Sequence, residues 1–315
     1  MQSQTIDQRG ALMVFGSAAV WSFGGAIARY LSVTESWTVV FWRSVFAAAF
    51  LLGFMLWRQG FKKTIDLFLA MGLPGVGVGV CFAIASICFV VALAYTTVAN
   101  ILLMQAGVPL IAALMAFLLF GEKVSRGTWA AIAAVIAGVA VMVSDSFGGK
   151  VSPIGDGLAV LIALAFATAT VITRRHSKVA MMPAVCLGTL IASAVAASMA
   201  QQFQVNAMDA GLLFMFGALN LGLGMALFVT GARLLPSAIA ALIGIAEPVL
   251  GPLWVWLMHN EIPSARTMLG GGIVFLALVA HIGWQLKQSR EETLVPTVDY
   301  LRKAIYFLME DQCFP

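Results

Sequence analysis

The chain has 315 residues, of which 61% are apolar and 10% are charged, and its mean hydropathy is +0.98. Soluble domains carry about a quarter charged residues and are less apolar, so this composition indicates an integral membrane protein. A formal net charge of +4 without a basic stripe excludes a nucleic-acid binder. The four cysteines form no C-x-x-C or Cys/His spacing, so neither a disulfide scaffold nor a metal site is expected.

Ten apolar stretches are long enough to cross a bilayer, which takes about 20 residues per helix. In chain order they cover residues 11–31, 37–57, 67–93, 98–119, 128–144, 156–173, 181–200, 211–232, 236–258 and 265–286. The first stretch is too long for the core of a signal peptide, so we expect it to be retained as a helix. The connections are short, small and polar. We therefore predict an all-α integral membrane protein with ten transmembrane helices.

The distribution of Lys and Arg predicts the orientation of these helices. With the N-terminus in the cytoplasm, twelve Lys and Arg residues fall on the cytoplasmic side, and only Lys150 and Arg266 fall in external loops. Cytoplasmic loops of membrane proteins carry this excess of positive charge. We therefore expect a multi-pass protein of the cytoplasmic (inner) membrane, with the N-terminus (residues 1–10) and the tail (residues 287–315) both cytoplasmic.

The two halves of the chain carry a weak internal repeat. A shift of 139 residues aligns Ala99 with Ala238, Pro109 with Pro248 and Glu122 with Glu261. A slightly different shift aligns Arg29 with Arg175 at the ends of the first and sixth helices. Because each half has five helices, an odd number, the halves must be inverted relative to each other, as in many secondary transporters. We predict a first five-helix repeat over residues 11–144 and a second over residues 156–286.

Four short segments resemble a known family: Ala19–Gly24 (AVWSFG), Phe41–Ser44 (FWRS), Val108–Lys123 (ending FLLFGEK) and Ile245–Glu261 (IAEPVLGP…NE). In their order and spacing, residues 10–286 resemble the EamA group of the drug/metabolite transporter superfamily. The resemblance implies a ten-helix, five-plus-five inverted-repeat secondary transporter that moves amino acids and other small metabolites, often outward. The chain departs from the family at His259-Asn260, where a Gly usually precedes the second Glu. Its sixth helix also lacks the Trp of many second halves, which could alter the substrate cavity.

Two charged side chains lie deep within predicted spans, where they are costly and therefore indicate function. Glu247 lies about halfway along the span 236–258, and Pro248 after it removes a backbone donor. An acid at a broken helix predicts a site for a proton or an amine, the alternative being an ion pair that holds the bundle together. Arg43 lies about 9 Å into the second helix and pairs either with Glu247 or with a substrate carboxylate. Arg29, nearer a helix end, is expected to be a snorkelling anchor.

Uncharged polar and aromatic residues supply the remaining site candidates. Asn100 and Gln105 in the fourth helix and Asn220 in the eighth either bind a polar ligand or link helices by hydrogen bonds. Trp21, deep in the first helix, either lines the substrate cavity or packs in the core. Tyr95, at the outer end of the third helix, could stack on an apolar or aromatic ligand.

Two further pairs are expected to have structural roles. Trp254 and Trp256 are expected to face lipid or the membrane interface. Glu122 and Glu261 each close a hairpin ahead of a helix, where a carboxylate meets free backbone N–H groups. The alternative for the two acids is a gating salt bridge with one of the nearby cations, Lys123, Arg126 or Arg266.

These features favour a secondary transporter that moves a small polar or amphipathic, amino-acid-like metabolite by alternating access, in the export direction. The alternatives are a proton-coupled multidrug or cation exporter that depends on Glu247, and an importer of a vitamin- or nucleoside-like metabolite. The three His residues have no acid cluster beside them, so no enzyme, metal or cofactor is expected. The expected partners are the small-molecule substrate, the bilayer and, as the candidate coupling ion, protons. No nucleic acid is expected, and the protein is predicted to be a monomer or homodimer.

Overall fold

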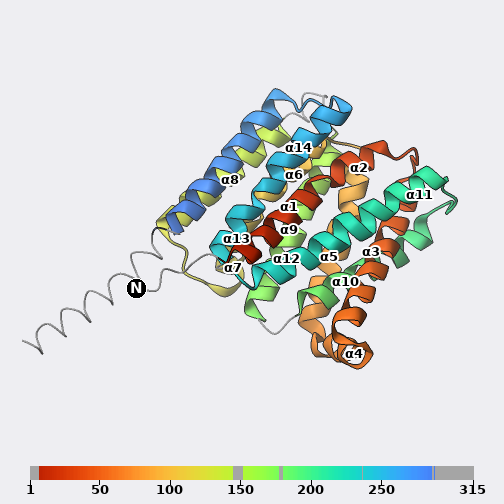
Figure 1. Ribbon diagram of the computed structural model, residues 1–315. Helices are drawn as coiled ribbons and strands as arrows, with labels where there is room; N and C mark the ends of the chain where they lie inside the picture. The colour runs from red at the N-terminus through yellow and green to blue at the C-terminus, as the bar shows by residue number, and fades with distance from the viewer. Residues whose placement is uncertain (1–6, 145–151, 177–179, 236, 286, 288–315) are drawn as a thin grey trace, which may run out of the picture.

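Helices make up the architecture of the computed structural model, which describes residues 7–144, 152–176, 180–235, 237–285 and 287, and no strand occurs in that part. The labelled helices are α1 (Gln8–Ser22), α2 (Gly24–Tyr30), α3 (Ser36–Gln59), α4 (Phe61–Ala70), α5 (Gly72–Ala92), α6 (Val98–Ala106), α7 (Val108–Phe120), α8 (Arg126–Val143), α9 (Pro153–Arg175), α10 (Met181–Met199), α11 (Ala207–Phe214), α12 (Gly224–Ala232), α13 (Ser237–Gly244) and α14 (Ala246–His259) (Figure 1). A π-helical segment, Met215–Leu223, joins α11 to α12, and a last helix covers Ala265–Gln285. The predicted tail, apart from Lys287, lies outside the described residues.

By length and composition, the described part of the chain holds up to ten membrane spans. Nine helices are long and apolar enough to cross a membrane, and the pair α6–α7, bent by 45°, makes a tenth. The predicted all-α class and span count are therefore confirmed. Most boundaries agree within a few residues, but the predicted span 67–93 begins inside α4. The chain turns between α4 and α5 at Gly72, where φ is +53°, a conformation that glycine adopts readily.

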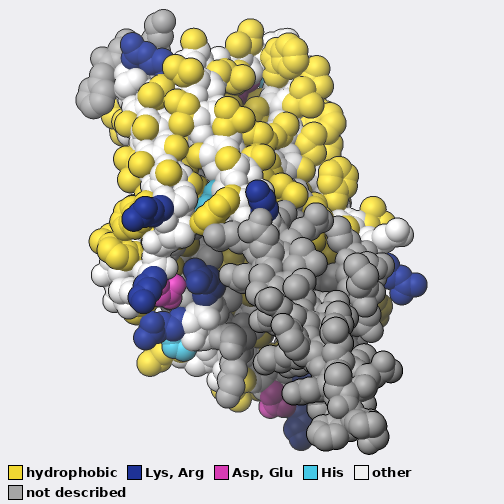
Figure 2. Space-filling model, turned by 90° about the vertical axis from the view of Figure 1, so that its left-hand side faces the viewer, with side chains coloured by type: hydrophobic (Ala, Val, Ile, Leu, Met, Phe, Trp, Pro, Cys, Tyr) yellow, Lys and Arg dark blue, Asp and Glu magenta, His cyan; other side chains and the backbone are white. Residues whose placement is uncertain are grey.

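The surface of the bundle is apolar along much of its length. Figure 2 shows hydrophobic side chains covering the upper part of one face, with most of the Lys and Arg of that face lower down. Leu73 and Leu276 expose 86% and 67% of their surface. Apolar surface of this extent is matched by acyl chains rather than by water.

The helix packing repeats between the two halves. In one contact the third span (α5) packs on the sixth (α9). The equivalent contact, five spans later, is between the eighth span (α12) and the first (α1). Likewise, the fourth span (α6 and α7) packs on the sixth, and its equivalent, the ninth span (α13 and α14), packs on the first. The second span packs on the seventh, the fourth on the ninth and the fifth on the tenth. Exchanging each span with the one five places later therefore gives the same set of packed span pairs, as two copies of one five-helix unit require.

The two glutamate hairpins also share one backbone geometry. Gly121 ends α7 and Asn260 ends α14, both in the left-handed region with φ of 65° and 53°. In each hairpin the N–H of the following residue, Glu122 or Glu261, donates to the carbonyl six residues earlier at 3.5 Å. Asn adopts the left-handed conformation at a modest cost, so the departure from the usual Gly leaves the hairpin intact.

Three spans break near the middle of their length. The first span breaks at Phe23, the fourth at Gly107 and the ninth at Ile245. Prolines follow two of the breaks, Pro109 in α7 and Pro248 in α14, and neither can donate a backbone hydrogen bond. Irregular backbone at membrane depth is tolerated where it is buried in protein or lines a cavity, so these breaks mark where a site can form.

Candidate functional site

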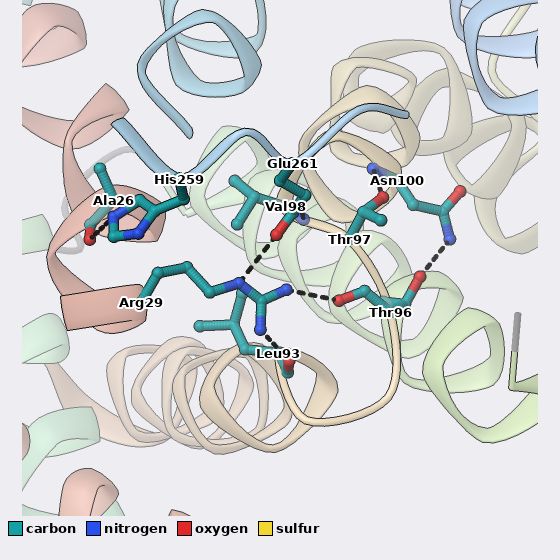
Figure 3. A network of polar contacts seen from close by, with 9 residues as sticks. All are labelled: Ala26, Arg29, Leu93, Thr96, Thr97, Val98, Asn100, His259 and Glu261. Carbon is teal, nitrogen blue, oxygen red and sulfur yellow. Dashed lines mark hydrogen bonds and ion pairs between the residues drawn. The ribbon is translucent and has the colours of Figure 1, made fainter. Parts of the chain in front are cut away.

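A polar network lies at one end of the bundle, where α14 packs on both α2 and α6 (Figure 3). Arg29 of α2 donates from Nε to Glu261 at 2.8 Å and from its two terminal nitrogens to the carbonyls of Leu93 and Thr96 at 2.7 and 3.0 Å. Glu261 also accepts the backbone N–H of Val98, the first residue of α6, at 2.8 Å. These five residues form the Glu261 cluster, in which the Arg29 and Glu261 side chains are 29% and 17% exposed.

The prediction that Arg29 is a snorkelling anchor is wrong. All three guanidinium nitrogens bind protein acceptors, two of them backbone carbonyls at the end of the third span. The carboxylate partner lies 232 residues away in the chain, so only the folded bundle brings it to Arg29. The two hairpin acids do form salt bridges, but Glu261 pairs with Arg29, and Glu122 pairs with Arg174 at 3.4 Å.

Asn100 lies beside the Glu261 cluster and joins two spans. Its side-chain nitrogen donates to the Thr96 hydroxyl at 3.0 Å and to a carboxylate oxygen of Asp156. Asp156 is buried in the first turn of α9. The Asn100 side-chain oxygen has no hydrogen-bond partner among the described residues. Asn100 thus links helices at this end of the bundle and keeps one free acceptor.

Glu247 lies in the first turn of α14, two residues after the break of the ninth span. Its side chain is partly buried, and within the described chain it forms no hydrogen bond or ion pair. The positive end of the α14 dipole favours a negative charge at this position. An unpaired acid at mid-span is costly unless it meets water, a proton or a ligand. The position therefore suits a proton or an amine.

Two further unpartnered polar groups lie at the depth of Glu247. Gly251 packs directly against Leu102 of α6 and against the end of α1, which sets the register of α14 with both helices. Three to five residues from this contact, or about 4.5–7.5 Å along the helix axes, lie Glu247 on α14, Gln105 on α6 and Ser17 on α1. The Gln105 amide nitrogen and the Ser17 hydroxyl are buried without a hydrogen-bond partner among the described residues. Such groups indicate a position where a ligand or water binds.

Arg43 is buried in α3 and is 6% exposed. It donates to the Ser86 hydroxyl at 3.0 Å, and its guanidinium carbon lies 4.3 Å from the ring centre of Phe216 and 5.5 Å from that of Phe89. Its Nε has no hydrogen-bond partner in the described chain, and no carboxylate pairs with it there. Of the two partners considered for Arg43, Glu247 is therefore not the one observed.

Asn220 and Trp21 lie in the packing between the first and eighth spans. Asn220 donates to the carbonyls of Val20 and Trp21 at 2.6 and 3.2 Å, which satisfies backbone groups next to the break at Phe23. The Trp21 ring packs against Gly224 of α12. Its indole N–H has no partner among the described residues.

The predicted aromatic residues differ in their exposure to the surface. Tyr95 is 44% exposed in the turn after α5, away from any described polar partner. Trp256 is half exposed, but the prediction that Trp254 faces lipid is wrong. Trp254 stacks on Phe23 at 4.7 Å between ring centres and donates to the Ser22 hydroxyl at 3.0 Å. Residues two apart on a helix point to nearly opposite sides, so only one of the two tryptophans can face outward.

Asp156 and His259 were not predicted as site residues. His259 contacts the Ala26 carbonyl through its ring nitrogen at 3.1 Å, next to the Glu261 cluster. Both residues lie at span ends, where polar residues are ordinary. An acid in the first turn of a helix is also favoured for local reasons, so no sequence signal separates Asp156 from a simple capping residue.

The fold and site together define a class. Ten apolar spans, two matching five-helix halves and unpaired polar groups at helix breaks are the architecture of a multi-pass membrane transporter.

Comparison with known proteins agrees with this class. The model of the EamA-like transporter family matches residues 8–144 and 153–282, one match for each half. Two curated relatives, both named "Pseudopaline exporter CntI", come from Pseudomonas aeruginosa strains UCBPP-PA14 and PAO1. Each is 26% identical over 284 residues, covering 86% of this chain and 95% of the relative. A solved structure named only "Crystal structure of protein" superposes with a TM-score of 0.59 at 17% identity, covering 90% of this chain and 98% of the other, and shows the fold alone.

The chain belongs to the EamA-like transporter family. The resemblance that the sequence motifs indicated is therefore confirmed. Family membership points to transport of a small molecule across a membrane rather than to catalysis.

Proposed function

We propose that this protein is a secondary transporter that exports a small, carboxylate-bearing, amino-acid-like metabolite across the cytoplasmic membrane by alternating access. The observation that carries the proposal is the buried Arg43 guanidinium, which has no carboxylate partner in the described chain. A buried cation is expensive unless it is paired, and a substrate carboxylate supplies the missing charge. Guanidinium groups bind carboxylates through two parallel hydrogen bonds, and the free Nε is one of the donors required.

Export is supported by the name of the two relatives, which are exporters. The predicted orientation agrees with this direction. With both termini in the cytoplasm, the Glu261 end of the bundle faces outward and is closed. In this conformation the protein would then bind its substrate from the cytoplasmic side.

The proposal is tested by a thermal-shift screen of the purified protein followed by counterflow in proteoliposomes. The panel pairs each carboxylic acid with its amide, so that only the charge differs. A ligand that binds only the folded state adds about 2.7 kcal/mol to the free energy of unfolding when its concentration is a hundred times its Kd. The melting temperature rises as a result. We expect acids, and not their amides, to stabilise the protein and to exchange in counterflow. A panel in which no acid does either would refute the proposal.

A second candidate, a proton-coupled exporter of cations, is favoured by the unpaired Glu247 at the break of the ninth span. Glu247→Gln removes the charge and keeps the size of the side chain. If the carboxylate binds a proton or an amine, counterflow or drug efflux should fall at least about tenfold, because the substitution removes the charge that holds the cation. Asp66→Asn, an exposed acid on α4, is the matched control and should retain full transport. Unchanged transport by Glu247→Gln eliminates the cation candidate.

A further inference from the structure

The two ends of the bundle carry related charge pairs in different states. Glu122 and Glu261 occupy equivalent hairpins, and each pairs with an arginine. The Arg29–Glu261 pair is 2.8 Å apart with side chains 29% and 17% exposed, whereas the Arg174–Glu122 pair is 3.4 Å apart with side chains 60% and 48% exposed. One end is therefore tightly bonded and the other is loose.

Helix packing is likewise tighter at the Glu261 end than at the Glu122 end. At the Glu261 end the outer halves of the two broken spans, α6 and α14, pack against each other. The equivalent halves at the Glu122 end are α13 and α7, which show no comparable packing between the residues that the structure describes. Instead α7 packs on α9 and α13 packs on α1, so each stays with its own neighbour.

The Glu261 cluster holds together three segments that must separate if that end opens. Glu261 follows α14 and binds both Arg29 of α2 and the N–H of Val98 at the start of α6. Removing either charge leaves the other half-buried without a counter-ion, which disfavours the closed arrangement. At the other end, Arg175, the residue aligned with Arg29, lies over the ring of Phe120 at 4.0 Å, close to the loosely paired Glu122.

We infer that the Glu261 cluster is the seal of one end of the transport pathway and must open in every cycle, while Glu122 with Arg174 and Arg175 forms the equivalent seal in the opposite conformation. The inference rests on the proposed transport function. The repeat supplies its physical basis, because exchanging the conformations of the two halves closes the loose end and opens the tight one. The two glutamates are thus gating residues that are engaged alternately.

The test measures the labelling of a single cysteine by a maleimide and needs no substrate. All four native cysteines are replaced by alanine, and Ser22→Cys is the reporter. Ser22 is buried at the end of α1 and covered by Trp254 of α14, so it becomes accessible when α14 leaves α6 and α2. In the purified full chain the reporter should label slowly. Adding Glu261→Gln should accelerate labelling by about tenfold or more, since the closed state loses its half-buried ion pair.

Three controls keep the outcome interpretable. Glu122→Gln should leave Ser22→Cys labelling slow, because the pair at that end is exposed in this conformation. Arg29→Gln should act like Glu261→Gln, and the double variant should label no faster than either single one, since one interaction is lost in all three. Ala192→Cys, a buried reporter in α10, a helix that contributes no residue to the Glu261 cluster, should stay slow in every variant.

The inference is overturned if Glu261→Gln labels Ser22→Cys as slowly as the parent or if Glu122→Gln accelerates it equally. It is also overturned if the Ala192→Cys reporter accelerates together with Ser22→Cys, because the substitution has then loosened the whole fold. None of these results bears on transport, which the counterflow assay measures independently. A failed seal therefore leaves the proposed function standing, and a failed counterflow assay leaves the labelling result standing.

Discussion

Replacing Arg43 with methionine is expected to weaken the binding of carboxylate ligands strongly and, at the same time, to raise the melting temperature of the ligand-free protein. Arg43 is a buried charge whose contacts are one hydroxyl and two aromatic rings. Replacing buried ion pairs by apolar side chains of similar volume is often neutral or stabilises proteins by about 1–4 kcal/mol, and a buried charge without a counter-ion has at least as large a desolvation cost to lose. The lost charge-assisted hydrogen bonds should weaken carboxylate binding on the order of tenfold to a hundredfold.

Arg58→Met is the matched control for this experiment. Arg58 lies on the same helix, donates to the Thr230 hydroxyl at 3.1 Å and lies 5.9 Å from the ring centre of Phe54, but it is exposed. Its replacement should change neither the melting temperature nor ligand binding appreciably, since exposed charges contribute little. A melting temperature that falls in Arg43→Met with unchanged ligand binding would show that Arg43 is held for packing and cation–π contacts alone.

Gly270→Ala is expected to destabilise the protein by about 1–3 kcal/mol, the usual cost of forcing an extra group into a packed interface. A Cβ on Gly270 would fall on the carbonyl oxygen of Gly138 in α8, and a Cβ on Gly138 would lie 2.6 Å from the carbonyl oxygen of Gly270. Because both obstacles are backbone atoms, no side chain can move aside and the fifth and tenth spans must separate. Small residues permit this kind of close helix contact in membranes.

The same helix provides the control for Gly270→Ala. A Cβ on Gly272 meets nothing within 4 Å, and Gly272 has ordinary helical backbone. Gly272→Ala should therefore be neutral or slightly stabilising, because alanine is the better helix former. The readout is the fraction of monodisperse protein left after heating in detergent, measured by size-exclusion chromatography. Equal melting curves for the two variants would contradict the packing argument.

The sequence was sufficient to predict the spans and their number, because hydrocarbon admits few polar groups and each span must be a continuous apolar run. It also predicted the repeat through Glu122 and Glu261, which lie in hairpins of identical backbone. The division of span 67–93 at Gly72 escaped prediction, since an apolar run does not show where a helix turns aside.

The candidate site was predicted only in part. Arg43 and Glu247 stand out because a charge in mid-span is rare, and the structure places both without a carboxylate or cation partner among its described residues. The roles of Arg29 and Trp254 were mispredicted, because each depends on a helix distant in the chain. Arg29 meets Glu261, and Trp254 meets Ser22.

The sequence by itself determined that this is an integral membrane protein, the number of its transmembrane spans and its division into two related halves. These properties follow from composition and periodicity, which act locally along the chain. Only the tertiary structure decided which charges are paired. Arg29 meets Glu261 across 232 positions of the chain and Arg174 meets Glu122 across 52, and the energy of both contacts exists only after the helices have packed.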